Sequence, residues 1–217
     1  MLRNRRKFFL KQFYKSFKYH ILSLTIIKYN AGNIQSVLYA LERIGMEAIV
    51  TDDHEKIMSA DKVIFPGVGE ASSAMKYLKD HRLDDLIKNL KQPVLGICLG
   101  MQLMCKHSEE NDTECLGVFD ATVKRFQVEN LQLKVPQIGW NSLVKISGPM
   151  FAGINHQPYC YFVHSYYAEL CEDTAATTEY GFVFSSALQK SNFYGVQFHP
   201  EKSAKVGEQI LKNFISL

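Results

Sequence analysis

The sequence of 217 residues lacks several features that define membrane or secreted proteins. No window reaches the roughly 18 uninterrupted apolar residues that a membrane-spanning helix needs. The five cysteines are an odd number with no Cys-x-x-Cys pair, which argues against a disulfide framework and against a zinc site built from cysteines. We therefore expect a soluble cytoplasmic protein without a metal or other cofactor, in which one cysteine is free to act as a reactive thiol.

The chain also lacks a large excess of charge, because its formal net charge is only +3. Residues 1–23 contain seven basic residues and no acidic one, which leaves a formal charge of −4 for residues 24–217. The mildly acidic charge of residues 24–217 argues against nucleic-acid binding as the main function of this domain.

Residues 1–23 differ in character from the rest of the chain. Leu10, Phe13, Phe17 and Ile21 recur at helical spacing between lysines. One interpretation is a basic amphipathic helix on an anionic membrane surface or a targeting peptide. The interpretation that we favour is a poorly ordered basic extension in front of a single domain, residues 24–217.

From residue 24 onward, short apolar segments alternate with segments of helical periodicity. The expected strands of the first half are 24–29, 48–51, 63–65 and 94–97, and the expected helices are 34–44, 55–58, 71–79, 83–90 and 99–106. The second half favours strands at 118–126, 142–146, 161–167, 182–186 and 194–198, followed by a helix at 204–214. Buried strands separated by helices predict an α/β domain with a mostly parallel sheet flanked by helices.

The segment Gly96-Ile97-Cys98-Leu99-Gly100 connects an expected strand to an expected helix. This is the G-x-nucleophile-x-G pattern, in which a sharp turn projects the central side chain above the sheet edge. A helix N-terminus also favours the negative charge of a thiolate. By itself the pattern is a weak signal, since a buried cysteine between glycines is more often a packing residue.

The C-terminal segment Phe198-His199-Pro200-Glu201 strengthens the prediction of a nucleophile. In an extended segment, residues two apart project to the same side, so Glu201 is expected beside His199. A carboxylate that orients an imidazole facing a thiolate is the arrangement of a catalytic triad. We therefore predict Cys98, His199 and Glu201 as catalytic residues, and the other four cysteines as structural.

The two motifs together resemble those of the class I (triad) glutamine amidotransferases. Residues 96–102 (GICLGMQ) are similar to the family's nucleophile signature, and residues 197–201 (QFHPE) are similar to its His/Glu signature. Finer segments resemble the branch that forms the glutaminase subunit of imidazole glycerol phosphate synthase, and these are residues 30–33, 66–69, 135–141, 161–167 and 201–203. The resemblance runs from about residue 24 to the C-terminus.

The resemblance implies a flavodoxin-like α/β core with an added small β-sheet. It also implies hydrolysis of L-glutamine to glutamate and ammonia through a thioester on Cys98. The ammonia would pass to a cyclase subunit of the (β/α)8-barrel type, in a heterodimer that serves histidine biosynthesis.

Residues of the oxyanion hole follow from the same resemblance. The loop of Gly67, Val68 and Gly69 would offer backbone N–H groups to the substrate and to the oxyanion, together with the N–H of Leu99. Losing one such donor typically costs about 3–4 kcal/mol of transition-state stabilisation. The alternative for the loop is an ordinary strand-to-helix turn.

Three further residues resemble those that hold the substrate. Gln102 lies one turn beyond Cys98, and Ser165 and Tyr166 match the segment that binds the amino-acid end of glutamine. A solvated helix residue and plain strand residues are the respective alternatives.

Asn33, Trp140 and Lys202 resemble residues that face the partner subunit. Trp140, the only tryptophan, is expected in a Gly-Trp-Asn turn, and tryptophan is enriched at interface hot spots. The alternatives are a core tryptophan and solvated polar side chains.

The sequence departs from the family's pattern at two places. Residues 28–30 are Lys-Tyr-Asn where Asp-Tyr-Gly is usual, and Gln137 stands where histidine is common. Because both segments are expected near the partner, a related synthase in surface-sugar synthesis is an alternative destination for the ammonia. A non-catalytic stabilising subunit and a stand-alone γ-glutamyl hydrolase are alternatives of other classes.

Overall fold

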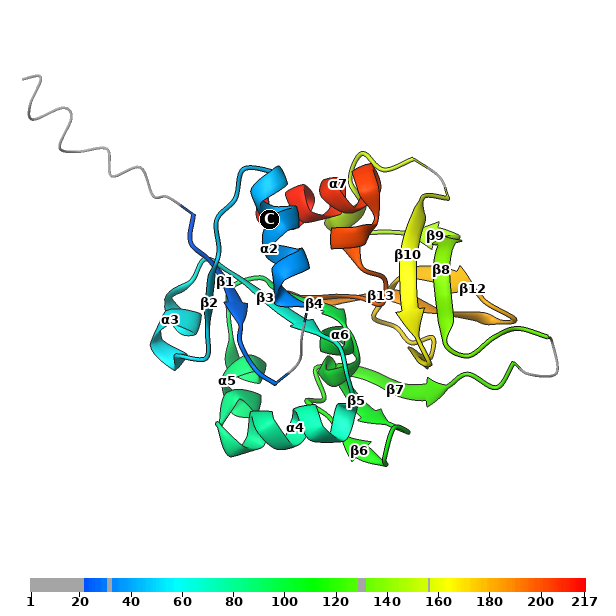
Figure 1. Cartoon of the computed structure of the whole chain (residues 1–217), viewed down its shortest axis with the longest axis horizontal. Helices are drawn as coiled ribbons and strands as arrows, with labels where there is room; N and C mark the ends of the chain where they lie inside the picture. Colours follow the sequence, from blue (N-terminus) through cyan, green and yellow to red (C-terminus); the bar gives the residue numbers. More distant parts are fainter. Residues whose placement is uncertain (1–21, 31–32, 129–131, 156) are drawn as a thin grey trace, which may run out of the picture.

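The computed structural model describes residues 22–30, 33–128, 132–155 and 157–217. These residues form a 12-stranded sheet with helices on both faces and a separate sheet of two strands (Figure 1). The main path of the large sheet runs in the order β2-β1-β3-β4-β14-β13-β11-β7-β5-β6. Off this path, β12 pairs with β13, and β9 pairs with β12.

One half of the large sheet is parallel. Its strands are β2 (Ile49–Thr51), β1 (Leu24–Ile27), β3 (Lys62–Gly67), β4 (Val94–Cys98) and β14 (Phe193–Val196). β4 lies between β3 and β14, with Gly67 beside Cys98 and Val196 beside Ile97. The carboxyl ends of these three strands therefore meet at one edge, which is where open α/β sheets bind ligands.

The other half of the large sheet is mostly antiparallel. Its strands are β13 (Val183–Lys190), β11 (Tyr166–Ala168), β7 (Phe119–Arg125), β5 (Cys105–Ser108), β6 (Thr113–Glu114), β12 (Thr174–Glu179) and β9 (Lys145–Ile146). The small sheet consists of β8 (Gln137–Ser142) and β10 (Tyr159–His164), paired antiparallel.

Helices cover the parallel half on both faces. One face carries α3 (His54–Ser59), α4 (Ala71–Asp80), α5 (Leu83–Asn89) and α6 (Leu99–Met104), and the other carries α2 (Ile34–Arg43) and α7 (Ala204–Ile215). Strand side chains alternate between the two resulting cores: Val63 and Phe65 pack with α3–α6, whereas Ile64 packs with α2 and α7. This confirms the predicted α/β fold, in which helices flank a parallel sheet and a small sheet is added; the antiparallel strands extend the same large sheet.

Several details differ from the sequence-based expectations, and four of them concern the site or the small sheet and its neighbours. The helix expected to reach residue 106 ends at Met104, because the following residues pair with β7 as strand β5. The expected turn around Trp140 is strand β8, whose partner β10 is supplied by residues about 20 positions later. The single strand expected at 161–167 is divided at Ser165 between the two sheets. β12 was not expected, and it forms by pairing with β13. In each case long-range pairing overrides local propensity.

Two short 3-10 helices complete the described chain, η2 (Pro149–Phe151) and η3 (Pro200–Lys202). The extension predicted for residues 1–23 lies almost entirely outside the described residues. Ser23, at its end, is tied to the domain by its backbone N–H and its hydroxyl, which both donate to the carboxylate of Asp61 at 2.7 Å.

Candidate active site

Cys98 occupies a sharp turn between β4 and α6. Its backbone has φ 53° and ψ −110°, a positive φ that is uncommon for a non-glycine residue. The turn is tight enough to require small neighbours: a Cβ atom on Gly100 would overlap the carbonyl oxygen of Phe65, and one on Gly96 would lie 2.8 Å from the backbone nitrogen of Met101. The flanking glycines therefore allow α6 to fold directly against β3 and β4.

His199 and Glu201 form a buried pair beside the end of β14. Nδ1 of His199 lies 2.8 Å from Oε1 of Glu201, and both residues are buried. The segment was expected to be extended, but Pro200 starts the 3-10 helix η3 and His199 is its N-cap. The pair forms because this tight turn, rather than an extended strand, brings the two side chains together.

The pKa of His199 is raised from 6.5 to about 10. Burial alone would lower this pKa, but the interactions of the imidazole with the sulfur of Cys98 and with the carboxylate of Glu201 outweigh burial. The direction means that the environment favours an imidazolium. The thiol of Cys98 itself contacts the carbonyl oxygen of Val163, with Sγ at 3.8 Å.

The backbone of His199 is fastened to strand β10. Its N–H donates to the carbonyl of Tyr161 at 2.8 Å, while its own carbonyl accepts a hydrogen bond of 2.6 Å from the hydroxyl of Ser203. That hydroxyl also accepts from the N–H of Tyr161 at 3.0 Å. Because Ser203 is fully buried, this closed set of bonds fixes the imidazole relative to the small sheet.

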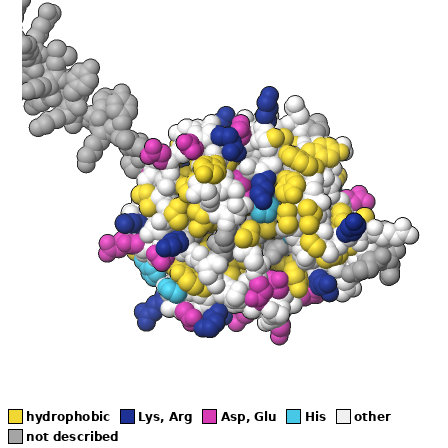
Figure 2. Space-filling model, in the orientation of Figure 1, with side chains coloured by type: hydrophobic (Ala, Val, Ile, Leu, Met, Phe, Trp, Pro, Cys, Tyr) yellow, Lys and Arg dark blue, Asp and Glu magenta, His cyan; other side chains and the backbone are white. Residues whose placement is uncertain are grey.

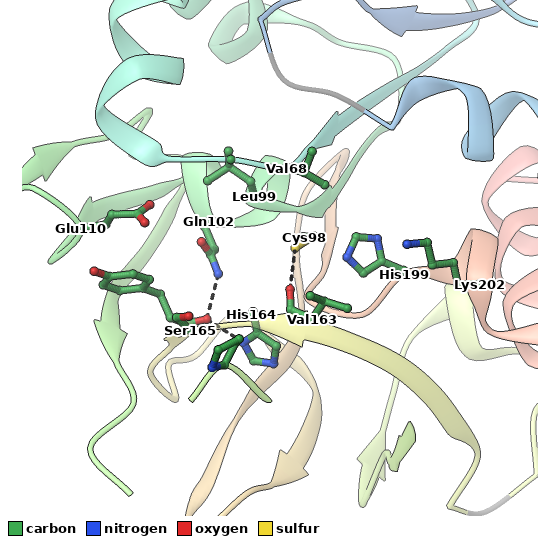
Figure 3. A pocket seen from close by; sticks show the side chains of 13 residues that line it. Val68, Cys98, Leu99, Gln102, Glu110, Val163, His164, Ser165, His199 and Lys202 are labelled. Atoms are coloured by element: carbon green, nitrogen blue, oxygen red, sulfur yellow. Dashed lines mark hydrogen bonds between the residues drawn. The ribbon is translucent and has the colours of Figure 1, made fainter. Parts of the chain in front are cut away.

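A pocket of about 310 Å³ connects these groups. Its lining contains Cys98 and His199 together with most of the predicted oxyanion and substrate residues, namely Val68, Gly69, Leu99, Gln102, Ser165 and Tyr166. Figure 3 shows Cys98 between Gln102 and His199. Gly67 and Glu201 lie behind the lining: Gly67 pairs with Cys98 in the sheet, and Glu201 contacts the far side of the imidazole.

The side chains of Gln102 and His164 both form hydrogen bonds with the carbonyl oxygen of Tyr166. The side-chain nitrogen Nε2 of Gln102 donates to the carbonyl of Tyr166 at 2.9 Å, and Nδ1 of His164 lies 2.7 Å from the same oxygen. Since a carbonyl only accepts, Nδ1 of His164 carries the proton. Burial lowers the pKa of His164 to about 4, so this ring is neutral and serves as a hydrogen-bond donor that supports the pocket wall.

Sequence reasoning missed Glu110, which is the carboxylate of the pocket lining. Glu110 follows β5, and its Oε2 accepts a hydrogen bond of 2.8 Å from the backbone N–H of Ala71 at the start of α4. Burial raises the pKa of this carboxyl group. The only sequence signal is its position 12 residues after Cys98, which could not show that the chain turns back toward the pocket.

The predicted partner-facing residues fall into two places. Trp140 is 53% exposed on β8, its ring lies 5.9 Å from that of Tyr161, and Nζ of Lys202 lies 5.9 Å from the same tyrosine ring. Lys202 also lines the pocket, so this cluster adjoins its mouth. Asn33 is instead the N-cap residue of α2, where its Oδ1 accepts a hydrogen bond from the hydroxyl of Ser36, and it is not part of the pocket lining.

The outer face of the small sheet is apolar. Trp140 stands opposite Tyr161 and Ile138 stands opposite Val163, so the four side chains share one face. Ile138 is 64% exposed, and Tyr159 on the same face is 59% exposed. Figure 2 shows hydrophobic side chains gathered over the middle of this side of the molecule, with most charged side chains around the margin.

Within the described ranges, no helix is long and apolar enough to cross a membrane. No cluster of three or more histidine, cysteine or acidic side chains in that part of the chain has the arrangement of a metal site. All five cysteines are free, and burial raises the pKa of Cys105, Cys115, Cys160 and Cys171.

Comparison with known proteins identifies the family. The family model described as glutamine amidotransferase class-I matches residues 25–217. The chain therefore belongs to the class I glutamine amidotransferases.

Within that family, curated relatives of this chain bear the name imidazole glycerol phosphate synthase subunit HisH. The protein of that name from Bacteroides thetaiotaomicron is 56% identical over 196 residues, which cover 90% of this chain and all of the relative. The one from Shewanella loihica is 48% identical over 202 residues, which cover 88% of this chain and 89% of the relative. The chain thus falls within the HisH group of the family.

Solved structures share the fold at lower identity. A structure titled glutamine amidotransferase has a TM-score of 0.68 at 19% identity, covering 88% of this chain and 97% of that chain. A glutamine amidotransferase from Thermotoga maritima has a TM-score of 0.61 at 20% identity, covering 90% and 83%.

Proposed function

We propose that this chain hydrolyses the side-chain amide of L-glutamine with Cys98 as nucleophile and passes the ammonia to a docked synthase subunit. The observation that carries the proposal is one pocket that joins a cysteine on a strained strand-to-helix turn to a histidine paired with a buried carboxylate. This is the arrangement that activates a thiol for acyl transfer.

In the first half of the reaction the sulfur of Cys98 attacks the amide carbon of glutamine. A C–S bond forms and the carbonyl electrons move to an oxyanion. Leu99, the first residue of α6, and the loop of Val68 and Gly69 border the sulfur, so their N–H groups are the proposed donors to that oxyanion. His199 gives its proton to the leaving nitrogen, the C–N bond breaks, and ammonia leaves a thioester on Cys98.

In the second half a water molecule replaces the ammonia. His199, now neutral, takes a proton from the water as its oxygen attacks the thioester carbon. The C–S bond then breaks, which releases glutamate and returns the thiolate beside the imidazolium. Glu201 holds Nδ1 of His199 throughout, at 2.8 Å, so that the other ring nitrogen can serve the sulfur and the substrate.

The two ends of the pocket suit the two ends of glutamine. Glu110 lies at the end of the lining beyond Gln102 (Figure 3), and its carboxylate is the proposed partner of the substrate's α-ammonium group. Nε2 of Gln102 is already occupied by the carbonyl of Tyr166, so its side-chain oxygen is the atom that would accept a substrate N–H group. The backbone of Ser165 and Tyr166 borders the same end of the pocket.

The proposed recipient of the ammonia is a cyclase subunit of the (β/α)8-barrel type in imidazole glycerol phosphate synthase, within histidine biosynthesis in the cytoplasm. Relatives that are 44% to 56% identical bear the name of a subunit of that synthase, which favours it over a surface-sugar synthase. Docking is chemically useful because free ammonia at neutral pH would be protonated and lost to solvent.

The proposed docking surface is the apolar face of the small sheet, with Ile138, Trp140 and Tyr159, together with Lys202 at the mouth of the pocket. A large exposed apolar face with an aromatic centre is typical of a protein–protein contact. Its position next to the pocket would place the partner's ammonia acceptor close to Cys98. Asn33, on α2, is the proposed outlying contact.

Replacement of the nucleophile tests the proposal. In the complex with the cyclase subunit, Cys98→Ala should abolish glutamine-dependent synthesis and leave ammonia-dependent synthesis intact, because only the glutaminase half-reaction uses the sulfur. Cys171→Ala, which removes another free cysteine that does not line the pocket, is the matched control and should keep both activities. Glutaminase activity retained by Cys98→Ala would contradict the mechanism.

Rates with and without the partner separate the alternative classes. Stimulation of glutamine turnover by the cyclase subunit supports a docked glutaminase. Full turnover by the isolated chain supports a stand-alone hydrolase, and no turnover under either condition supports a stabilising subunit. A glutamine-mimicking electrophile should label Cys98 and spare the other cysteines.

A further inference from the structure

Gln197 is a fully buried side chain that lies against the reacting sulfur. It follows β14 directly and precedes His199 by two residues, and its backbone N–H donates to the carbonyl of Ser186 at 2.9 Å. Its side-chain nitrogen Nε2 lies 3.7 Å from Sγ of Cys98, at hydrogen-bonding distance for sulfur. Gln197 does not line the substrate pocket, so it contacts the nucleophile from behind.

The orientation of this amide is fixed by a second glutamine. Nε2 of Gln102 must face the carbonyl of Tyr166, because a carbonyl accepts only from a donor. The same nitrogen lies 2.9 Å from Oε1 of Gln197, so the oxygen end of Gln197 faces Gln102. The opposite end, the N–H₂ group, is thereby turned toward the sulfur of Cys98.

The sulfur consequently has a different neighbour for each protonation state. The carbonyl of Val163, 3.8 Å away, can accept the S–H of a thiol, whereas Gln197 offers a donor to a thiolate. A buried N–H group whose partner is an anion stabilises that anion more than it stabilises the neutral form.

We propose that Gln197 is a further catalytic residue, whose amide N–H holds Sγ of Cys98 in position for attack and favours the thiolate. Gln102 fixes the orientation of this amide. This inference rests on the proposed glutaminase chemistry, in which Cys98 is the nucleophile. It adds a neutral donor to the sulfur beside the imidazolium of His199. No atom is transferred to or from Gln197.

Two substitutions of Gln197 distinguish the loss of its N–H donor from a loss of packing. Gln197→Glu has the same shape and keeps an oxygen for Gln102, but it removes the N–H aimed at the sulfur. Gln197→Met keeps the approximate volume and removes both contacts. The matched control is Gln209→Met, at an exposed position on α7 where the side chain contacts Asn213.

The measurement is the rate of alkylation of Cys98 by iodoacetamide as a function of pH, read by mass spectrometry on the full chain without partner or substrate. Both Gln197 variants should move the midpoint of the rate profile to higher pH by about one unit or more, and Gln197→Glu should move it furthest. Gln209→Met should leave the midpoint unchanged. In the complex, glutamine turnover should fall at least tenfold in kcat with KM within about twofold, because Gln197 does not contact the bound substrate.

The alkylation rates distinguish a failure of the proposed nucleophile from a failure of the proposed role of Gln197. If the wild-type Cys98 reacts no faster than the partly buried Cys115 and Cys171, the proposed nucleophile itself is wrong. If Cys98 is reactive in the wild type and the folded Gln197 variants keep its pH profile, only the role of Gln197 is overturned. Should Gln197→Met fail to fold, judged by circular dichroism, the Gln197→Glu profile decides.

Discussion

His199 is held between two groups that favour its protonated form. Burial lowers the pKa of an imidazole, but the sulfur of Cys98 and the carboxylate of Glu201 raise the pKa of His199 to about 10. Nδ1 contacts Glu201 at 2.8 Å, and the bonded pair is almost fully buried. The imidazolium that the proposed reaction needs, to give a proton to the leaving nitrogen, is therefore present at neutral pH.

Substitution of Glu201 by glutamine should change the pH dependence as well as the rate. Glu201 contributes to the raised pKa of His199, so its loss lowers that pKa and moves the alkaline limb of kcat/KM for glutamine to lower pH. An amide can also favour the wrong imidazole tautomer, and the expected fall in kcat is about 10³- to 10⁴-fold. The measurement is the pH–rate profile of the partner-bound enzyme.

The control for this substitution is Glu208→Gln. Glu208 lies on α7, pairs at 3.6 Å with Arg43 near the surface, and does not line the pocket. The Glu208→Gln variant should leave unchanged both the alkaline limb of the kcat/KM profile and the value of kcat. An alkaline limb that stays in place in the Glu201 variant would show that the carboxylate does not set the pKa of His199.

At the scale of elements, the contact between α6 and β3 requires a residue without a side chain. Gly100 lies on the buried face of α6, and a Cβ atom there would overlap the carbonyl oxygen of Phe65 in β3. Because Cys98 is the N-cap of this helix, any displacement of α6 also moves this proposed nucleophile and the N–H of Leu99.

Gly100→Ala should therefore destabilise the chain even though alanine is the better helix former. In an exposed helix the change stabilises by about 1 kcal/mol, whereas the steric overlap should lower the free energy of unfolding by about 3 kcal/mol. Urea denaturation measures this difference. Gly117→Ala is the contrasting control, since Gly117 has φ 70° with no atom near its missing Cβ and should cost only about 1 kcal/mol. A Gly100→Ala chain as stable as the wild type would contradict the packing argument.

Strand β10 connects the proposed docking face to His199, the proposed catalytic base. Its outward side chains include Tyr159 and Tyr161, while its backbone at Tyr161 bonds to His199 and to Ser203. The carbonyl of Val163 on the same strand contacts the thiol of Cys98. A shift of this strand would change the relative positions of Cys98 and His199, so docking at the proposed face would have a direct structural route to the pocket.

At the scale of the whole molecule, the proposed docking face and the mouth of the pocket lie together. Trp140→Ala should weaken binding of the cyclase subunit by about 2 kcal/mol or more, close to 30-fold in Kd, because a central exposed tryptophan is a typical hot spot. Isothermal titration calorimetry checks this value. Glutamine-dependent synthesis should fall at limiting partner and recover at saturation.

Met58→Ala is the matched control for the docking face. Met58 is 56% exposed on α3, at the opposite end of the molecule from β8 in Figure 1. Its removal should leave partner affinity unchanged. Equal losses for the two variants would mean that the small sheet is not the docking surface.

Much of the fold and part of the candidate site could be predicted from the sequence. Apolar runs and helical periodicity gave the parallel half of the sheet and its helices within a few residues, because those strands are buried on both faces and those helices have a clear amphipathic stripe. Cys98, His199 and Glu201 were predicted from local motifs. The strands in the second half of the chain were harder to predict, because strands such as β8 and β12 form only through pairing with distant segments.

Neighbouring residues are enough to predict the glycine-flanked turn at Cys98, the spacing of His199 and Glu201, and the alternation of strands with helices. The position of β14 beside β4 is visible only in the folded chain, and it brings residues about 100 positions apart into one pocket. The same pairing placed Gln197 against the sulfur, and the return of the chain after β5 placed Glu110 in the pocket lining. The physical reason is that local spacing encodes local geometry, whereas the choice of neighbouring strands depends on packing of the whole chain.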